Sequence, residues 1–102
     1  MATVTSKVLF RGAATTTVGT TLYTVPASTT AVVTNIAVVN TTATAGTFDL
    51  ALDGTKLATT QAIAASSTAY IDLKQVLATT KVIAGGASAI TINFHISGVE
   101  IS

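Results

Sequence analysis

The sequence predicts an all-β protein, a single β-sandwich of about eight short strands with jelly-roll or Greek-key connections. Charged residues make up only 9% of the 102 residues and aromatic residues only 5%, while threonine, which is β-branched and favours strands, is heavily used. Apolar and polar residues alternate over short segments, turn signals recur about every 8–12 residues, and no amphipathic helix is evident. The length suits one domain, so we assign residues 1–102 to one sandwich.

The longest strand-favouring segment is residues 31–40, AVVTNIAVVN, which is apolar on both faces. A strand with one wet face shows a polar residue at every second position, whereas here only Thr34 and Asn35 interrupt the apolar run. We therefore predict a central strand with one face in the core and the other beneath a loop, a second sheet or another chain. Strict alternation gives one set of Val32, Ile36 and Val38 and a second set of Val33, Ala37 and Val39.

The chain before this segment predicts two further strands. Residues 3–11 form the first, and we expect residues 1–7 to serve also as an N-terminal arm. Residues 20–25 form the second, with Leu22 facing inward and Tyr23 on the opposite face. Pro26 ends this strand because proline cannot donate to a sheet ladder. The short turn that follows predicts an antiparallel hairpin between this strand and the central one.

A second hairpin is predicted around Asp53-Gly54. Residues 46–52 alternate cleanly, with Phe48, Leu50 and Leu52 inward and Thr47, Asp49 and Ala51 outward. Glycine accepts positive φ freely and aspartate tolerates it, as a type I′ turn requires. Residues 55–60 then form the return strand, which residues 61–65 extend or follow as a short edge piece.

The last third of the chain predicts three more strands, over residues 68–73, 81–84 and 89–102. Residues 72–77 have the spacing of one helical turn capped by Asp72, and Gly85-Gly86 indicates a turn. In the final segment the even-numbered positions from Ile90 to Ile96 are apolar. The parity changes at Gly98, which predicts a β-bulge or a bend.

Several classes of partner are disfavoured by composition. The net charge is +1 and the basic residues are scattered, which argues against nucleic acid. The chain has no cysteine and therefore no disulfide or thiolate metal site. The first residues lack the layout of a signal peptide, and no apolar run approaches the ~20 residues of a membrane helix. We expect synthesis in the cytoplasm and no membrane partner.

The residues that carry chemistry do not form a recognisable site. His95 is the single histidine, and Asp49, Asp53, Asp72 and Glu100 are far apart in sequence. We therefore predict no catalytic, cofactor-binding or metal-binding residues, and no enzyme. Asp49 and Asp53 flank a hairpin and would allow a weak calcium site, but an ordinary turn is favoured. The glycine pair lacks the lysine and helix of a phosphate loop.

The two tyrosines, Tyr23 and Tyr70, both fall on predicted outward faces. Tyrosine brings a large contact area at low entropic cost, so each side chain suits an interface anchor. Each equally suits a partly buried position at a sheet edge, and both interpretations stay open.

Two blocks resemble a known family. They are YTVPASTTAVVTNIAVVNTTATAGTFDLALDG, residues 23–54, and YIDLKQVLATTKVIAGGASAITINFHISGVEIS, residues 70–102. Together they resemble small β-sandwich virion structural proteins of tailed bacteriophages, of the capsid decoration or cement type. The shared motifs are turn residues and core alternation. The chain departs from the family at Thr79-Thr80, where a Gly-Asp pair is usual.

The resemblance implies a non-enzymatic virion subunit on the capsid surface. Its partners would be the major capsid protein and sister subunits, in a homo-oligomer for which a trimer is favoured. It implies that the second face of residues 31–40 is buried against a neighbour or a loop, and that residues 1–7 lie on the capsid protein. One alternative is a neck, tail or fibre-base component. Another is a carbohydrate-binding adhesin module, which the absence of tryptophan disfavours.

Overall fold

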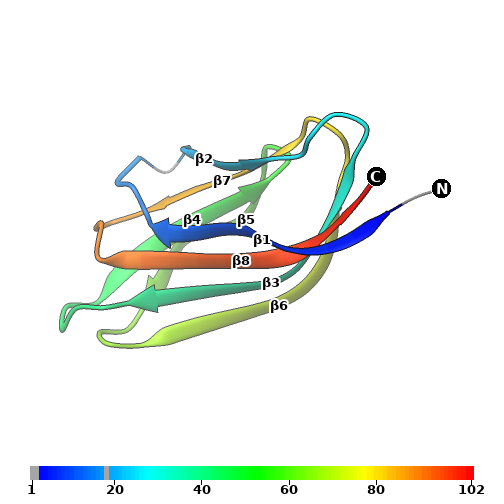
Figure 1. Cartoon of the computed structure of the whole chain (residues 1–102). Helices are drawn as coiled ribbons and strands as arrows, with labels where there is room; N and C mark the ends of the chain where they lie inside the picture. Colours follow the sequence, from blue (N-terminus) through cyan, green and yellow to red (C-terminus); the bar gives the residue numbers. More distant parts are fainter. Residues whose placement is uncertain (1–2, 18) are drawn as a thin grey trace.

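The computed structural model describes residues 3–17 and 19–102, and every regular element in that part of the chain is a β-strand. Two four-stranded antiparallel sheets pack as a sandwich, with strand orders β1-β8-β3-β6 and β2-β7-β4-β5 (Figure 1). The strands are β1 (Val4–Ala13), β2 (Thr21–Thr24), β3 (Thr30–Asn40), β4 (Gly46–Leu52), β5 (Thr55–Ile63), β6 (Thr68–Leu77), β7 (Val82–Ala87) and β8 (Ile92–Ile101). The predicted all-β sandwich is confirmed.

The connectivity is that of a jelly roll. β1 pairs with β8, β2 with β7, β3 with β6 and β4 with β5, as in one long hairpin folded over on itself. Apart from the β4–β5 hairpin, every connection between consecutive strands crosses from one sheet to the other. Eight strands in two Greek keys define this double-sheet architecture.

The predicted hairpin between β2 and β3 is wrong, because these strands lie in different sheets. The connection that contains Pro26 crosses the end of the sandwich instead of closing a hairpin. Its backbone bonds go to the β6–β7 connection, where the N–H of Val25 donates to the carbonyl of Lys81 over 2.9 Å. The turn signal at Pro26 therefore correctly predicted a change in chain direction, but it did not predict which strand pairs with β2.

β3 is the predicted central strand, flanked by β8 and β6. Its two faces differ from strict alternation, because the register slips between Val33 and Asn35 and leaves Thr34 as an extra residue opposite β8. The slip places Val33 in the core with the even-numbered residues that follow the bulge. The buried apolar residues of β3 are Ala31, Val33, Ile36 and Val38, and the outward ones are Val32, Ala37 and Val39.

The irregularity predicted at Gly98 is present in the neighbouring strands. β1 slips between Val8 and Phe10, and β3 slips at Thr34, on either side of the same part of β8. A Cβ atom on Gly98 would lie 2.1 Å from the carbonyl oxygen of Val32, so only glycine fits here. All four strands bend toward the second sheet at the end where the termini lie (Figure 1), as bulges produce.

Two local predictions in the second half of the chain are also wrong. Residues 72–77 form the end of β6 and no helical turn, because pairing with β3 as far as Leu77 supplies backbone partners that outweigh local helical spacing. Gly85-Gly86 lies inside β7. A Cβ atom on Gly85 would lie 2.6 Å from the carbonyl oxygen of Asp49, so the glycine permits close approach of β4.

The β4–β5 hairpin is confirmed. Asp53 and Gly54 have φ values of 53° and 74°, the positive values of a type I′ turn. Phe48 and Leu50 are buried as predicted, and Leu52 packs against the core. Asp49 falls on the face of β4 opposite to Phe48 and Leu50, as predicted, but it is buried there, because the N–H of Thr60 on the irregularly paired β5 donates to its carboxylate.

The core lies between the sheets and draws on both. Phe48 of β4 meets Phe94 of β8 edge to face, with ring centroids 6.3 Å apart and planes at 73°. Ile92, Phe94 and Ile96 are buried as the alternation predicts, whereas Ile90 precedes β8 and is exposed. Burial of these side chains supplies most of the folding free energy.

Residues 3–7 of the predicted N-terminal arm, which spans residues 1–7, belong to the sheet. Thr3 and Ser102 exchange backbone hydrogen bonds, and residues 4–7 pair with β8 as the first part of β1. Residues 1–2 lie outside the described residues. No helix of the described ranges is long and apolar enough to cross a membrane.

Candidate interaction surface

The outer face of the sheet β1-β8-β3-β6 collects side chains from all four strands. Cross-strand partners point to the same face of a sheet, so the register defines rows that run across it. One row joins Ser6, Val99, Val32 and Val76, and the adjoining row toward the termini joins Val4, Ile101 and Thr30. The second sheet packs on the opposite, inner face.

Outward apolar side chains at the bent end of this sheet form what we call the valine facet. Val4 is 65% exposed and Val76 is 68% exposed, while Val32 at the centre is half-buried between its neighbours. At strand spacings of ~4.8 Å and ~3.3 Å per residue, four strands by five residues give about 300 Å², the size of the largest apolar patch on many monomers. The facet consists of Val4, Val8, Val32, Val76, Val99 and Ile101.

A shallow groove crosses the face where the sheet bends. The residues that line it are Ser6, Lys7, Val8, Thr34, Ser97, Gly98 and Val99. The Thr34 hydroxyl donates to the carbonyl of Ser97 over 3.2 Å, which holds the bulge. The groove therefore follows from the same register slip that bends the sheet.

The flatter end of the face carries a different row, formed by Arg11, His95, Ala37 and Tyr70. His95, the single histidine, is half-buried between Arg11 on β1 and Ala37 on β3. Tyr70 is 73% exposed on β6. This row combines a cation, an imidazole and an aromatic ring on one surface.

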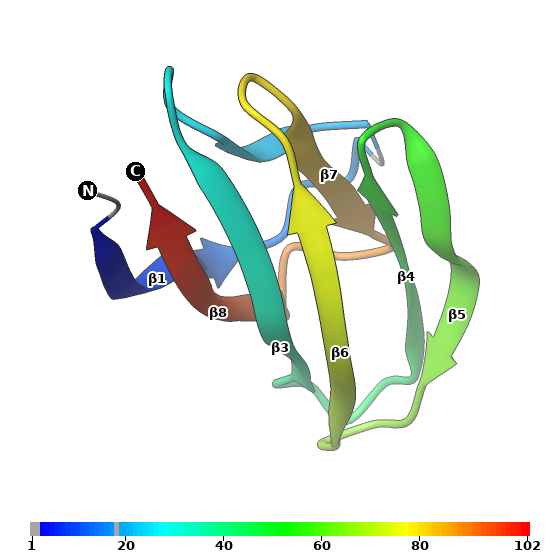
Figure 2. The ribbon, with the colours of Figure 1, turned by 90° about the vertical axis from the view of Figure 1, so that its right-hand side faces the viewer.

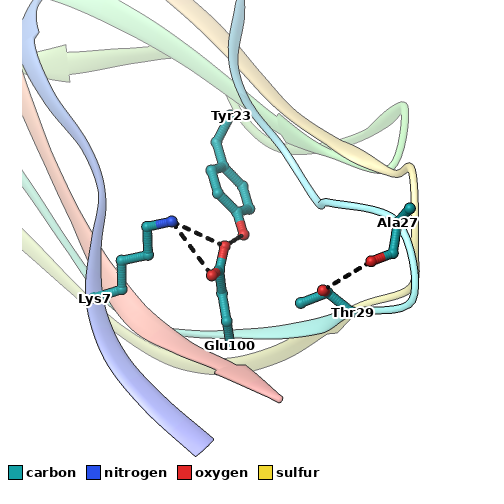
Figure 3. Close-up of polar contacts among 5 residues, drawn as sticks. All are labelled: Lys7, Tyr23, Ala27, Thr29 and Glu100. Atoms are coloured by element: carbon teal, nitrogen blue, oxygen red, sulfur yellow. Dashed lines mark hydrogen bonds and ion pairs between the residues drawn. The ribbon is translucent and has the colours of Figure 1, made fainter. Parts of the chain in front are cut away.

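A polar cluster ties the two sheets together at the bent end (Figure 3). The Tyr23 hydroxyl, on β2, donates to the Glu100 carboxylate on β8, and the Lys7 ammonium, on β1, lies 3.3 Å from the same carboxylate. The hydrogen bond from Tyr23 has the largest effect on the pKa of Glu100 and lowers it. Burial opposes this effect, and the hydrogen bond and charge of Lys7 lower the pKa further. Burial and the Glu100 carboxylate raise the pKa of Tyr23.

The two tyrosines therefore have different environments. Tyr70 points outward, as an interface anchor would. Tyr23 was predicted to face outward, but it packs against the core and reaches Glu100. β2 slips in register against β7 between Thr21 and Tyr23, so Leu22 and Tyr23 both pack inward.

The other carboxylates each have their own partner and are not brought together. Asp49 accepts from the N–H of Thr60 over 3.1 Å and lies 3.8 Å from Lys56. Asp53 is paired with Lys81, and Asp72 accepts from the Asn35 amide. Among the described residues, no group of three or more histidine and acidic side chains is placed to hold a metal ion.

Sequence reasoning missed one structural polar residue, Asn40. Its buried side chain donates to the carbonyls of Thr44 and Ala64 and accepts from Thr42, so it joins the β3–β4 and β5–β6 connections. Its position as a polar residue at the end of an apolar strand was the available signal.

Comparison with protein-family models and with curated protein sequences finds no match to this chain.

Proposed function

We propose that this protein is a non-enzymatic virion structural subunit of a tailed bacteriophage. In this role it decorates the capsid surface and stabilises the head by packing against the major capsid protein and sister subunits. The observation that carries the proposal is the valine facet, an outward apolar surface built from all four strands of one jelly-roll sheet. The jelly roll is an architecture of viral capsid domains as well as of lectins. The sequence resemblance favours the virion among these.

The physical basis is contact, not chemistry. Charged residues are sparse and the net charge is +1, so the surface offers little electrostatic repulsion to a close neighbour. An apolar patch of about 300 Å² is less than half of the ~800 Å² that each partner contributes to a standard interface. Firm attachment therefore requires either a second contact or several linked subunits on one particle.

Co-sedimentation with empty capsids tests the attachment. We expect the purified chain to sediment with capsids of the major capsid protein. The double substitution Val4→Lys/Val8→Lys should reduce binding at least about tenfold, because two charges would be buried without partners. Ile90→Lys is the matched control, because Ile90 is 67% exposed but lies outside the facet, and this variant should bind like the wild type.

Failure of the wild-type chain to bind capsids, or an equal loss of binding in the Ile90→Lys variant, would contradict the decoration role.

A carbohydrate-binding module is the alternative from another class, since lectins share this architecture and Tyr70 offers an exposed ring. Specific binding on a glycan array, abolished by Tyr70→Ala, would favour that alternative.

A further inference from the structure

β6 is a ten-residue strand at a free edge of its sheet. A sheet edge presents unpaired backbone groups, and proteins block it with short strands, bulges or lysines. β2 has only four residues, β1 is bulged between Val8 and Phe10, and β5 has two register shifts against β4. β6 has one register shift against β3, between Asp72 and Gln75, and one outward lysine, Lys74, which stands beside the acidic Asp72. Its even-numbered side chains, from Thr68 to Val76, are exposed along the whole strand.

The outward side chains of β6 form an ordered series. Tyr70 and Val76, which are 73% and 68% exposed, stand on either side of Asp72 and Lys74. The series therefore runs from an aromatic ring through a negative and a positive charge to a branched apolar side chain. Figure 2 shows β6 with β3 on one side and no strand of its sheet on the other.

We propose that β6 is a self-association edge, at which β6 of a second copy adds antiparallel about a two-fold axis through Leu73. In this arrangement Asp72 of each copy lies directly opposite Lys74 of the other, and Tyr70 lies opposite Val76. Opposite charges and aromatic–β-branched pairs are both favourable across antiparallel strands. The two sheets β1-β8-β3-β6 then become one continuous sheet of eight strands.

The charges select this register over its neighbours. Moving the two-fold axis from Leu73 to Asp72 places Asp72 opposite Asp72 of the second copy, and moving the axis to Lys74 places Lys74 opposite Lys74. Both shifts put like charges face to face. An axis midway between two residues would place an outward side chain opposite an inward one, which the pleat of the sheet forbids. Of these axis positions, only the one at Leu73 places opposite charges face to face.

The inward side of the edge also gains from a second copy. Ile71 and Leu73 are only partly buried at the margin of the core. The groove between the sheets on this side is lined by Gln75 of β6 and by β4–β5 residues that include Leu57, which is 38% exposed. A strand added beside β6 covers this apolar margin.

The bend of the sheet is compatible with the pairing. The register slip opposite Thr34 bends β6 near its middle, between Asp72 and Gln75. A two-fold axis along the local sheet normal at Leu73 leaves that bend unchanged, so both copies curve in the same sense.

The contact is modest in size. Ten residues span ~33 Å and a sheet layer is ~10 Å deep, which gives about 330 Å² of contact section per copy. This is below the ~800 Å² per partner of a standard interface, so we expect a reversible dimer. A two-fold contact closes on itself as a dimer, which distinguishes it from the trimer that the sequence resemblance favours. The inference does not depend on the virion role.

Sedimentation equilibrium of the full chain over a wide concentration range tests the proposal. We expect a monomer–dimer equilibrium. Lys74→Glu should raise the dissociation constant at least about tenfold, because it places two acidic side chains opposite each other. The swap Asp72→Lys/Lys74→Glu restores opposite charges in reversed order, and it should bring the constant back to within about threefold of the wild type.

An apolar pair supplies the control. Val76→Asp should weaken the dimer, whereas Val4→Asp should not, although Val4 is 65% exposed on the same sheet. A chain that stays monomeric at every concentration would overturn the proposal, as would a trimer, a dimer indifferent to Lys74→Glu, or a swap that fails to restore association. Since no capsid is present, these outcomes are separate from failure of the decoration role.

Discussion

At the scale of single residues, the polar cluster of Lys7, Glu100 and Tyr23 connects the two sheets at the bent end of the sandwich. It joins β1 and β8 of one sheet to β2 of the other through side chains alone. Glu100 has a lower pKa in the folded chain than a free glutamate. Its contribution to stability is therefore fully present above the unfolded value of about 4.3 and is lost as the pH falls through the folded value.

The acid side of the stability profile tests this cluster. The difference in unfolding free energy between the wild type and Glu100→Gln should be largest near neutral pH and should shrink steadily below about pH 4.3. Urea unfolding from pH 7 to pH 2.5 measures it. Tyr23→Phe should remove much of the same difference, because the hydrogen bond from Tyr23 is the main cause of the lowered pKa. A difference independent of pH would contradict the assignment.

The alkaline side gives a second prediction. The pKa of Tyr23 is raised in the folded chain, so its contribution is intact below the unfolded value of about 10 and is lost as the pH rises above it. The wild type should lose stability above about pH 10 more steeply than Tyr23→Phe, as thermal unfolding would show. Equal slopes for the two proteins would contradict the raised pKa of Tyr23.

Gly98 provides the sharpest steric prediction. An added Cβ would meet the Val32 carbonyl oxygen at 2.1 Å, whereas nothing lies within 4 Å of a Cβ on Gly19. Gly98→Ala should therefore cost more than about 2 kcal/mol of unfolding free energy. Gly19→Ala should change it by less than about 1 kcal/mol. Similar costs at both positions, measured by urea unfolding, would show that β8 does not pass this close to β3.

At the scale of elements, the sequence predicted strands better than it predicted their partners. Clean alternation identified the buried positions of β4 and β8, and Asp53-Gly54 identified the only hairpin between consecutive strands in the described chain. The β2–β3 hairpin and the helical turn at the end of β6 failed because pairing between distant strands outweighs local turn and helix signals. The faces of β3 were misassigned because a bulge at Thr34 leaves no mark in the composition.

The Asp53-Gly54 turn supports a prediction at this scale. Gly54 has φ of 74°, where a Cβ is strained. Gly54→Ala should destabilise the protein by about 1 kcal/mol, and Gly54→Asn should cost less, because asparagine tolerates this region. Chemical denaturation of the two variants would compare them. An alanine variant as stable as the asparagine variant would contradict the type I′ geometry.

At the scale of the whole molecule, the two sheets share one core, centred on the edge-to-face contact of Phe48 and Phe94. The sandwich class followed from composition and strand spacing alone. The candidate surface was predictable only in part, since the second apolar face of residues 31–40 was evident but the bend and the valine facet depend on bulges. Tyr70 was identified as a candidate anchor, whereas the inward position of Tyr23 required the register of β2.

Because the core is shared, the sandwich should unfold as one cooperative unit. Phe94→Ala should cost about 3–5 kcal/mol, as large aromatic deletions in cores do. A double-mutant cycle with Phe48→Ala should give a coupling of about 0.5–1.5 kcal/mol for the aromatic pair. Two separate unfolding transitions in the wild type, or no coupling, would show that the sheets are stabilised independently.

The central claim, a decoration role on a phage capsid, is tested most directly by the copy number of this chain in purified virions. Quantitative mass spectrometry against the major capsid protein measures it. We predict a number of copies comparable to that of the major capsid protein. A count of about a dozen would place the chain at the neck or tail, and its absence from the particle would contradict the structural role altogether.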